Sequence, residues 1–225
     1  MGSAMNYIWD FSAVWRNGGM LLDGFANTAL LTATCLVLAL PLGLLLALMR
    51  LSNARPLRFL GLAYVNFFRA APALVLIVWF YFAFPVIIGV EMNAFEASIL
   101  AIGLQSAAYM AEVFRGGMQA IRRGQWEAAR AIGLSSADTI RFVILPQAVR
   151  QMIPVFLIRF AELVKATTLA GVIAYGETVY MANELSTQTY RPLETFTAIA
   201  LLFFVLIFGI TSFSKLLEKR LIAGR

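Results

Sequence analysis

Two groups of polar side chains follow helical spacing inside stretches that are otherwise apolar. The members are Gln105, Tyr109 and Glu112 in one stretch and Arg159, Glu162 and Lys165 in the other. On a helix the first group spans an arc of roughly 60° and the second an arc of roughly 120°, so each group shares one face. An ionisable side chain inside a membrane span costs roughly 2.5–3.5 kcal/mol on insertion scales, which makes such residues candidates for function. We therefore expect two polar faces that meet around a cavity.

A cavity of this kind suits a solute that carries a carboxylate, and all six residues are candidates for binding it. Glu162, one turn from Lys165, is expected to be the counter-charge of that ammonium. Glu112 is expected to offset one of the two positive charges in the later stretch, which leaves the other for the substrate. Two positive charges against one negative favour an acidic or zwitterionic solute over a cationic one. The alternative is that the charges pair only with one another and fix the packing of the helices.

The sequence lacks the residues of the common catalytic and metal sites. It contains no His, and Cys35 is its only cysteine, which excludes an internal disulfide and a metal cluster built on cysteines. It has no G-x-x-x-x-G-K-[ST] stretch, so we do not expect it to bind ATP through a P-loop. We expect no catalytic residue, no metal site and no cofactor in this chain, and any energy from ATP has to come from a partner.

The composition places the chain in a membrane. Of its 225 residues 61% are hydrophobic and 13% are charged, and the mean hydropathy is +0.80. A soluble domain is about half apolar and about a quarter charged, so the excess apolar surface indicates contact with lipid. The net charge of +6 is explained by basic residues on cytoplasmic loops, and we expect no nucleic-acid partner. The first residues lack the basic start and short apolar core of a cleavable signal peptide.

The elements that must position the candidate residues are membrane-spanning helices. A helix needs about 20 residues to cross about 30 Å of hydrocarbon, and five stretches are long and apolar enough: about 25–49, 70–90, 96–117, 152–174 and 194–214. No alternating pattern of barrel strands is present. The sequence therefore predicts an all-α membrane protein with five transmembrane helices. We expect a periplasmic or interfacial segment 1–24, one transmembrane domain 25–217, and a cytoplasmic tail 218–225.

The basic residues indicate how the chain is oriented. They concentrate in three segments: Arg50, Arg55, Arg58 and Arg69 in a loop 50–69; Arg122, Arg123, Arg130, Arg141 and Arg150 in 118–150; and Lys215, Lys219, Arg220 and Arg225 at the C-terminal end. Cytoplasmic loops carry an excess of Lys and Arg. We therefore expect an outer N-terminus, an inner C-terminus and a cytoplasmic segment 118–150.

Segment 118–150 carries a motif with fixed spacing. Its members are Glu127, Ala128, Ala129, Gly133, Leu145 and Pro146. The stretch EAARAIGL predicts a short helix that Gly133 ends, followed by a second helix capped by Ser135 or Ser136. The motif resembles the EAA loop of bacterial ABC importer permeases, with Val143 in place of the usual Ile. The alternative is an ordinary amphipathic loop at the membrane surface.

The resemblance extends over about 55–190. The stretches AAYMAEVFRGGMQAIRRGQWEAARAIGLS, ILPQAVRQMIP and LVKATTL are similar to the polar amino-acid branch of these permeases, the histidine, glutamate and glutamine type. FRAAPALVLIVWFYFAFP resembles that branch's Arg-Gly-Thr-Pro stretch, with Ala70 and Ala71 in place of Gly-Thr. Thr167 and Thr168 join the substrate-binding candidates on this basis, although Lys-Ala-Thr-Thr departs from the usual Lys-Asp-Thr-Ser.

This resemblance implies a type I ABC importer permease in the bacterial inner membrane. It implies that the EAA loop is a coupling helix that docks on an ATPase subunit, and that a pair of these ATPases binds ATP and Mg. It also implies a second permease subunit, homologous or identical, and a periplasmic or surface amino-acid-binding protein. The alternatives are a membrane scaffold that docks an ATPase without transport, and an ABC permease for another small solute. A stand-alone secondary carrier fits poorly, because no internal inverted repeat is present.

Overall fold

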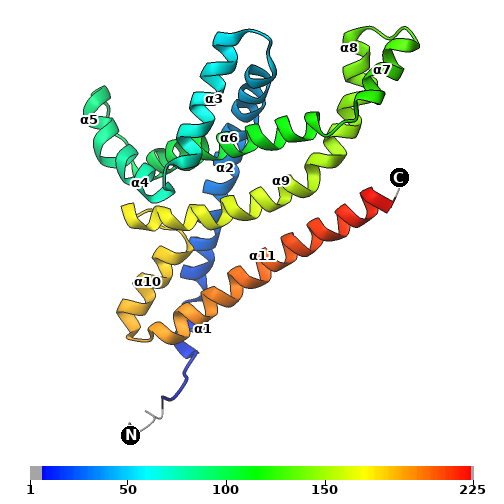
Figure 1. Cartoon of the computed structure of the whole chain (residues 1–225). Coiled ribbons are helices and arrows are strands. Elements are labelled where there is room, and N and C mark those ends of the chain that lie inside the picture. The colour runs from blue at the N-terminus through cyan, green and yellow to red at the C-terminus, as the bar shows by residue number, and fades with distance from the viewer. Residues whose placement is uncertain (1–6, 224–225) are drawn as a thin grey trace, which may run out of the picture.

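The computed structural model describes residues 7–223, and within them the regular structure is helical throughout (Figure 1). The α-helices are α1 (Ser12–Arg16), α2 (Gly18–Leu51), α3 (Arg55–Ala70), α4 (Ala73–Val78), α5 (Phe84–Ile88), α6 (Ala94–Gln119), α7 (Arg123–Ala131), α8 (Ser136–Asp138), α9 (Leu145–Thr167), α10 (Thr178–Thr189) and α11 (Pro192–Ala223). Wider π-type turns occupy Trp79–Ala83 and Thr139–Ile144, and a tighter 3-10 segment occupies Thr168–Ile173. The predicted all-α class is confirmed.

Three of these helices, α2, α6 and α11, are long and apolar enough to cross a membrane by themselves. A fourth candidate is the pair formed by Arg55–Ala70 and Ala73–Ile88, which is bent by 102°. Helix α9 carries Arg150 together with the three charges of the predicted site, and these lower its mean hydropathy. The count of five spans stays a prediction.

The expected loop 50–69 was wrong, because it is mostly helix α3. The expected span 70–90 contains one continuous helical stretch, Ala73–Ile88, formed by α4, the π-type turn and α5, and a break at residues 71–72 separates it from α3. Helix α3 was missed because its arginines alternate with exposed apolar side chains such as Phe59 and Phe67, so its mean hydropathy is low. The break follows from Pro72, since the residue before a proline prefers extended backbone. Ala71 accordingly has a ψ of 134°.

Small residues allow α2 and α6 to pack closely. Ala39, Gly43 and Ala47 lie four residues apart on one face of α2, and all are buried. A Cβ atom added to Gly43 would lie 2.7 Å from the Cβ of Met110 and 2.9 Å from the carbonyl oxygen of Ala107. Lipid supplies no hydrophobic force between two helices, so close van der Waals contact between small residues holds such pairs together. This packing fixes α6, the helix that carries the first polar group.

The N-terminal segment is tied to the start of α11. The hydroxyl of Tyr7 donates to Glu194 Oε2 at 2.5 Å, and the backbone N–H of Asp10 donates to Glu194 Oε1 at 3.0 Å. Helix α2 begins at Gly18, seven residues before the predicted start of the first span at 25. Residues 1–6 and 224–225 of the predicted terminal segments lie outside the described residues.

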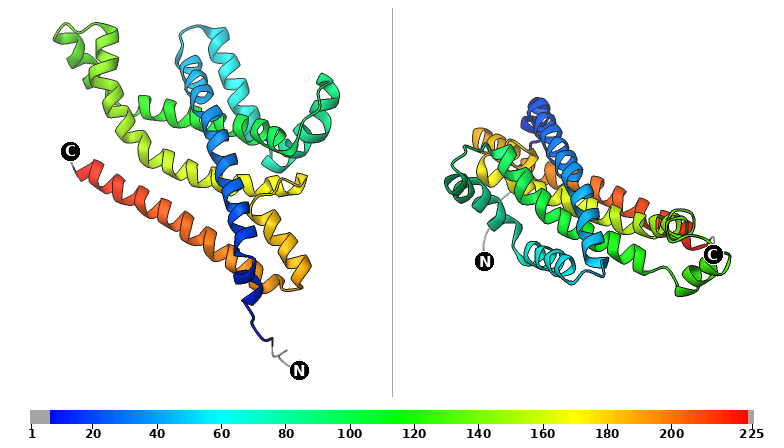
Figure 2. Two further views of the ribbon diagram at one scale, coloured as in Figure 1. Left: turned by 180° about the vertical axis from the view of Figure 1, so that it is seen from behind. Right: turned by 90° about the horizontal axis from the view of Figure 1, so that it is seen from above.

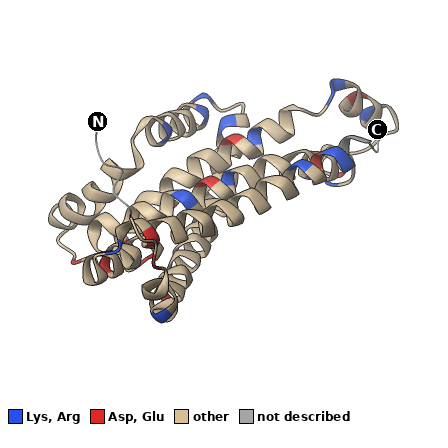
Figure 3. Cartoon of the chain, turned by 90° about the horizontal axis from the view of Figure 1, so that it is seen from below, with Lys and Arg blue, Asp and Glu red and all other residues tan. Residues whose placement is uncertain are grey.

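The N-terminal segment and the C-terminus lie at different ends of the molecule. The N-terminal segment lies at one end, and the C-terminal part of α11 lies on the side from which α7 and α8 project (Figures 1 and 2). Lys and Arg residues lie at the end that holds the C-terminus and also along the middle of the molecule (Figure 3). The segment Arg123–Asp138, here named the α7–α8 corner, projects at the end that holds the C-terminus.

Helix α10 begins with a buried acidic cap outside the candidate spans. The Glu177 side chain is fully buried, and its two oxygens accept the backbone N–H groups of Val179 and Tyr180, each at 2.8 Å. Burial raises the pKa of this carboxyl from its ordinary value of 4.5 to about 7, although the two N–H groups oppose the shift. The carboxyl therefore takes up a proton within the pH range in which such proteins are handled.

The protein is expected to be more stable near pH 5 than near pH 8. Between the two pKa values the folded chain holds a proton on Glu177 that the unfolded chain has lost, so the free energy of unfolding falls as pH rises. The difference amounts to about 3 kcal/mol, because one pKa unit corresponds to about 1.4 kcal/mol. Thermal unfolding in detergent across this range checks it, and Glu177→Gln should flatten the profile. Equal pH slopes in the two proteins would contradict the assignment.

Candidate functional site

Four of the six predicted polar side chains meet in one place. Gln105 and Tyr109 of α6 and Arg159 and Glu162 of α9 line a pocket of about 330 Å³, here named the α6–α9 pocket. The other lining residues are Ser106, Met110, Leu163 and Ala166. The prediction that the polar faces of these two stretches lie against one cavity thus holds for four residues, while their role in binding a substrate stays a prediction.

The pocket holds a positive and a negative group side by side. Arg159 Nη1 donates to Glu162 Oε2 at 2.5 Å, and the guanidinium carbon lies 4.9 Å from the centre of the Tyr109 ring. A cation over an aromatic face is attracted to the ring's negative charge density. The ion pair is open to the pocket, since the Arg159 and Glu162 side chains are 31% and 49% exposed. Solute groups can therefore reach both charges.

Lys165 lies outside this pocket. It lines a separate groove of about 390 Å³ against α11, with Phe204, Ile207 and Phe208 among its neighbours. The prediction that Glu162 neutralises Lys165 was wrong, because Glu162 pairs with Arg159. The predicted arc of roughly 120° is wide enough to reach two different neighbouring helices. Arg159 faces α6 and Lys165 faces α11, so a shared helix face did not mean a shared site.

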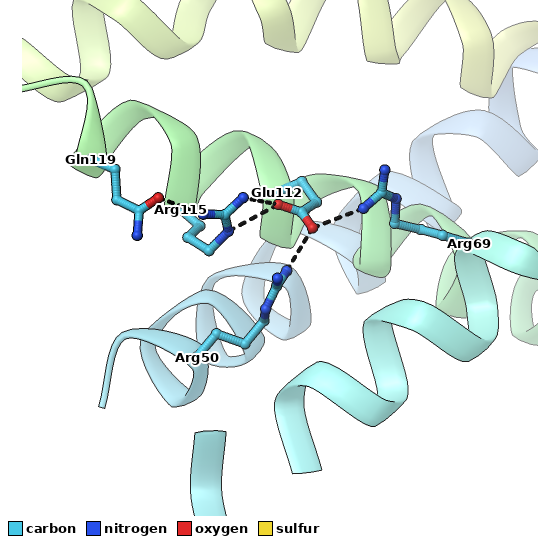
Figure 4. A network of polar contacts seen from close by, with 5 residues as sticks. All are labelled: Arg50, Arg69, Glu112, Arg115 and Gln119. Atoms are coloured by element: carbon cyan, nitrogen blue, oxygen red, sulfur yellow. Dashed lines mark hydrogen bonds and ion pairs between the residues drawn. The ribbon is translucent and has the colours of Figure 1, made fainter. Parts of the chain in front are cut away.

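Glu112 is surrounded by arginines (Figure 4). Its Oε1 accepts from Arg50 Nη1 at 2.7 Å and from Arg69 Nη1 at 2.8 Å, and its Oε2 accepts from Arg115 Nη2 at 2.6 Å. The prediction that Glu112 offsets a positive charge of α9 was therefore wrong. Its partners come from the ends of α2 and α3 and from its own helix. The sequence could not show the first two, which are 62 and 43 residues away.

Removing the charge of Glu112 is expected to destabilise the fold. Glu112→Gln would leave three guanidinium groups close together around a neutral amide. Breaking a fully buried ion pair from one side costs about 3–5 kcal/mol, whereas an exposed pair contributes about 0–1 kcal/mol. We expect a loss of about 2 kcal/mol, between these limits, because the Glu112 side chain is 19% exposed and that of Arg69 is 40% exposed. Thermal unfolding of the purified chain measures this, with Glu91→Gln at an exposed position as the control. Equal melting temperatures for the two variants would show that the cluster is not stabilising.

The two threonines that follow Lys165 do not line the α6–α9 pocket. Thr167 is fully buried, donates to the carbonyl of Val164 at 2.8 Å, and lies 3.3 Å from the hydroxyl of Thr32. Thr168 donates to the carbonyl of Lys165 at 2.7 Å. Both therefore satisfy carbonyl groups at the end of α9. No group of three acidic, His or Cys side chains able to hold a metal occurs among residues 7–223.

The helix–turn–helix predicted around Gly133 is present. Gly133 has a φ of +79°, its N–H donates to the carbonyl of Arg130 at 3.0 Å, and the next N–H, of Leu134, donates to Ala129 at 3.1 Å. These two bonds form the usual glycine-terminated end of a helix. Ser135, one of the two predicted caps, accepts the N–H of Asp138 at 3.1 Å and begins α8.

Most residues of the motif that begins at Glu127 are open to solvent. Those exposed are Glu127, Ala128, Gly133, Leu145 and Pro146, whereas Ala129 is buried at 3% exposure. Sequence reasoning missed Ile132, whose side chain is 77% exposed at the tip of the corner. An isolated apolar side chain next to an exposed motif would have been a signal for a contact surface.

The fold and these sites can be set beside known proteins. A family model described as a binding-protein-dependent transport system inner membrane component matches residues 39–223. The chain belongs to this family. It is 35% identical to the probable glutamine ABC transporter permease protein GlnM of Bacillus subtilis (strain 168), over 93% of this chain and 97% of the relative. It is 31% identical to the arginine transport system permease protein ArtQ of the same strain, over 94% and 97%.

A solved structure described as an amino acid ABC transporter with histidines superposes with a TM-score of 0.87 at 30% identity. The match covers 95% of this chain and 100% of that one. The predicted resemblance to ABC importer permeases and the permease-like fold are thereby confirmed. This family member is a multi-pass inner-membrane protein and a transporter subunit, not an enzyme.

Proposed function

We propose that this chain is the membrane-spanning subunit of an ABC importer for polar amino acids. The observation that carries the proposal is the adjacent guanidinium and carboxylate of Arg159 and Glu162 in the α6–α9 pocket. A free amino acid carries one carboxylate and one ammonium, and each can pair with the opposite charge of the pocket. The names of the relatives, which refer to glutamine and arginine, support the same class of substrate.

The pocket suits a small zwitterion in both size and chemistry. Its volume of about 330 Å³ lies at the lower end of small-molecule sites, which are roughly 300–1,000 Å³. The substrate carboxylate would accept from N–H groups along an edge of the Arg159 guanidinium, and the substrate ammonium would donate to Oε1 of Glu162. Charge-assisted bonds of this kind are short and strong. The side chain of the substrate would lie against Leu163 and Ala166.

The exposed α7–α8 corner is proposed to dock on an ATPase subunit. A pair of these subunits would bind ATP and Mg, and a second permease subunit and an amino-acid-binding protein would complete the importer. We also propose that the N-terminus is outside and the C-terminus inside, on the basis of the basic residues near the C-terminal end. Cysteines introduced at Ser12 and Ser136 in a Cys35→Ser chain should then react with an impermeant thiol reagent from opposite sides of the membrane.

Substrate-stimulated ATP hydrolysis by the reconstituted complex tests this function. The permease, ATPase and binding protein are placed in liposomes, and acidic, neutral and cationic amino acids are added one at a time. We expect at least a fivefold stimulation by one or more polar amino acids, with acidic or zwitterionic ones ahead of cationic ones. Stimulation only by sugars, peptides or inorganic ions would show that the substrate class is wrong.

A further inference from the structure

One side chain of the α6–α9 pocket also holds the bend between α3 and α4. The last carbonyls of a helix lack partners within that helix, and here the chain turns by 102° directly after α3. Gln105 Nε2 donates to the carbonyl of Phe68 at 3.1 Å and to that of Ala71 at 2.7 Å. Both acceptors are oxygens, so the amide nitrogen has to face them. Residues 68–73 are here named the α3–α4 corner.

The other end of the same amide is available to the pocket. Gln105 is only 8% exposed and lines the α6–α9 pocket, and its Oε1 accepts no hydrogen bond from any side chain or backbone group among residues 7–223. Among residues 7–223, Thr139 Oγ1 is the only side-chain oxygen or nitrogen atom that is both fully buried and without a hydrogen-bond partner. Gln105 Oε1 has no partner either, so it has to be accessible to solvent. Gln105 thus contacts the corner through its nitrogen and leaves its oxygen for an occupant of the pocket.

The other hydrogen bonds and ion pairs between α3 and α6 do not involve the pocket. The hydroxyl of Tyr64 donates to the carbonyl of Leu104 at 3.1 Å, and Arg69 pairs with Glu112 at 2.8 Å. None of these residues lines the α6–α9 pocket. Of the hydrogen bonds that hold the end of α3 on α6, those of Gln105 come from a side chain that lines the pocket. Tyr109, which also lines the pocket, contacts α3 through the Arg69 guanidinium, whose carbon lies 5.9 Å from the centre of the Tyr109 ring.

We propose that Gln105 is a positioning residue that transmits occupancy of the pocket to the α3–α4 corner. When an ammonium group donates to Oε1, the amide becomes more polarised and its N–H groups become better donors, because linked hydrogen bonds strengthen one another. The bonds to Phe68 and Ala71 then tighten and narrow the range of angles at the corner. The identity of the solute rests on the proposed function, whereas the hold of Gln105 on the corner rests on geometry alone.

The substitution Gln105→Glu separates positioning from binding. It keeps the shape of the side chain, but it sets a carboxylate against the two carbonyl oxygens of the corner. It also offers an ammonium a better acceptor than an amide. If Gln105 only binds the substrate, the variant complex should keep or lower the KM for substrate-stimulated hydrolysis without loss of kcat. If Gln105 is a positioning residue, kcat for this hydrolysis should fall at least tenfold while KM stays unchanged or falls.

Pulsed electron resonance between two spin labels measures the corner directly. In a Cys35→Ser chain, labels replace the exposed residues Leu60 on α3 and Ile87 on α5, and the labelled chain is diluted with unlabelled chain in the complex. We expect the distance distribution to narrow when a stimulating amino acid is added. In Gln105→Glu it should be at least 1.5-fold broader and should not respond. Gln119→Glu, the same change at an exposed position of α6, is the control and should behave like the unaltered protein.

The outcomes distinguish this inference from the proposed function. If an amino acid stimulates hydrolysis but leaves the distribution unchanged, transmission through Gln105 is wrong and the function stands. If Gln105→Glu matches the unaltered protein with and without amino acid, Gln105 does not hold the corner. If no amino acid stimulates the complex, the function and the ammonium step both fail, while broadening without amino acid would still establish the hold on the corner. Gln105→Met, which adds no charge, replaces the Glu variant if that variant does not assemble.

Discussion

Replacing Gly133 with valine is expected to lower substrate-stimulated ATP hydrolysis by the complex at least tenfold. Gly133 has a φ of +79°, where a side chain with a Cβ atom costs about 1–2 kcal/mol and a β-branched one is an outlier. No atom lies within 4 Å of an added Cβ, so the strain falls on the backbone turn and not on packing. The α7–α8 corner should change shape while the transmembrane part stays folded.

Two other glycines provide matched controls for this result. Gly89 has a φ of +69° and open space around it, but it lies at the end of α5, so Gly89→Val introduces similar strain away from the corner. Gly124 lies within α7 and is also unobstructed, so Gly124→Ala should preserve or improve the helix. Both controls should keep hydrolysis within about twofold of the unaltered complex, about 0.4 kcal/mol in activation free energy. Normal ATPase association, hydrolysis and uptake with Gly133→Val would remove the docking role of the corner.

The combined change Arg159→Met and Glu162→Gln is expected to lower kcat/KM for uptake at least a hundredfold. Both charges are removed together, so neither is left unpaired and the fold should tolerate the change. The pair is partly exposed, and an exposed pair contributes only about 0–1 kcal/mol to stability. A substrate, by contrast, would lose two charge-assisted hydrogen bonds, each contributing about 1.5–3 kcal/mol. Assembly and basal ATP hydrolysis should persist, which uptake assays and size-exclusion chromatography together measure.

Lys165→Met tests whether the substrate binds in the α6–α9 pocket or at Lys165, the residue that the sequence analysis favoured. If the substrate binds between α6 and α9, this variant should keep uptake within about threefold, because Lys165 lines the groove against α11 and about threefold corresponds to only about 0.7 kcal/mol. Loss of uptake with Lys165→Met, together with normal uptake by the double variant, would place the substrate in that groove. Loss in both would show that the two faces of α9 bind the substrate together.

The sequence alone determined the class of the protein and the form of the α7–α8 corner. The high fraction of apolar residues indicates contact with lipid. Lipid offers no hydrogen bonds, so the backbone groups inside it have to pair with one another in helices or closed barrels. Local chemistry was also sufficient at the corner. A glycine that can adopt a positive φ ends α7, and a serine oxygen that accepts a free N–H begins α8. These features depend on residues that are only a few positions apart, so they can be predicted from the sequence alone.

Only the tertiary structure decided which polar groups meet. Helical periodicity gives the direction of a side chain around its own helix, but it does not say which other helix lies there. Arg159 and Lys165, both on α9, therefore face different neighbours, and Glu112 binds arginines from α2 and α3 instead of offsetting α9. The carbonyl groups at the bend after α3 likewise find their donor in Gln105, which lies 34 residues beyond Ala71. Such contacts are set by how the helices pack, because a charge pairs with the opposite charge that the fold brings within reach.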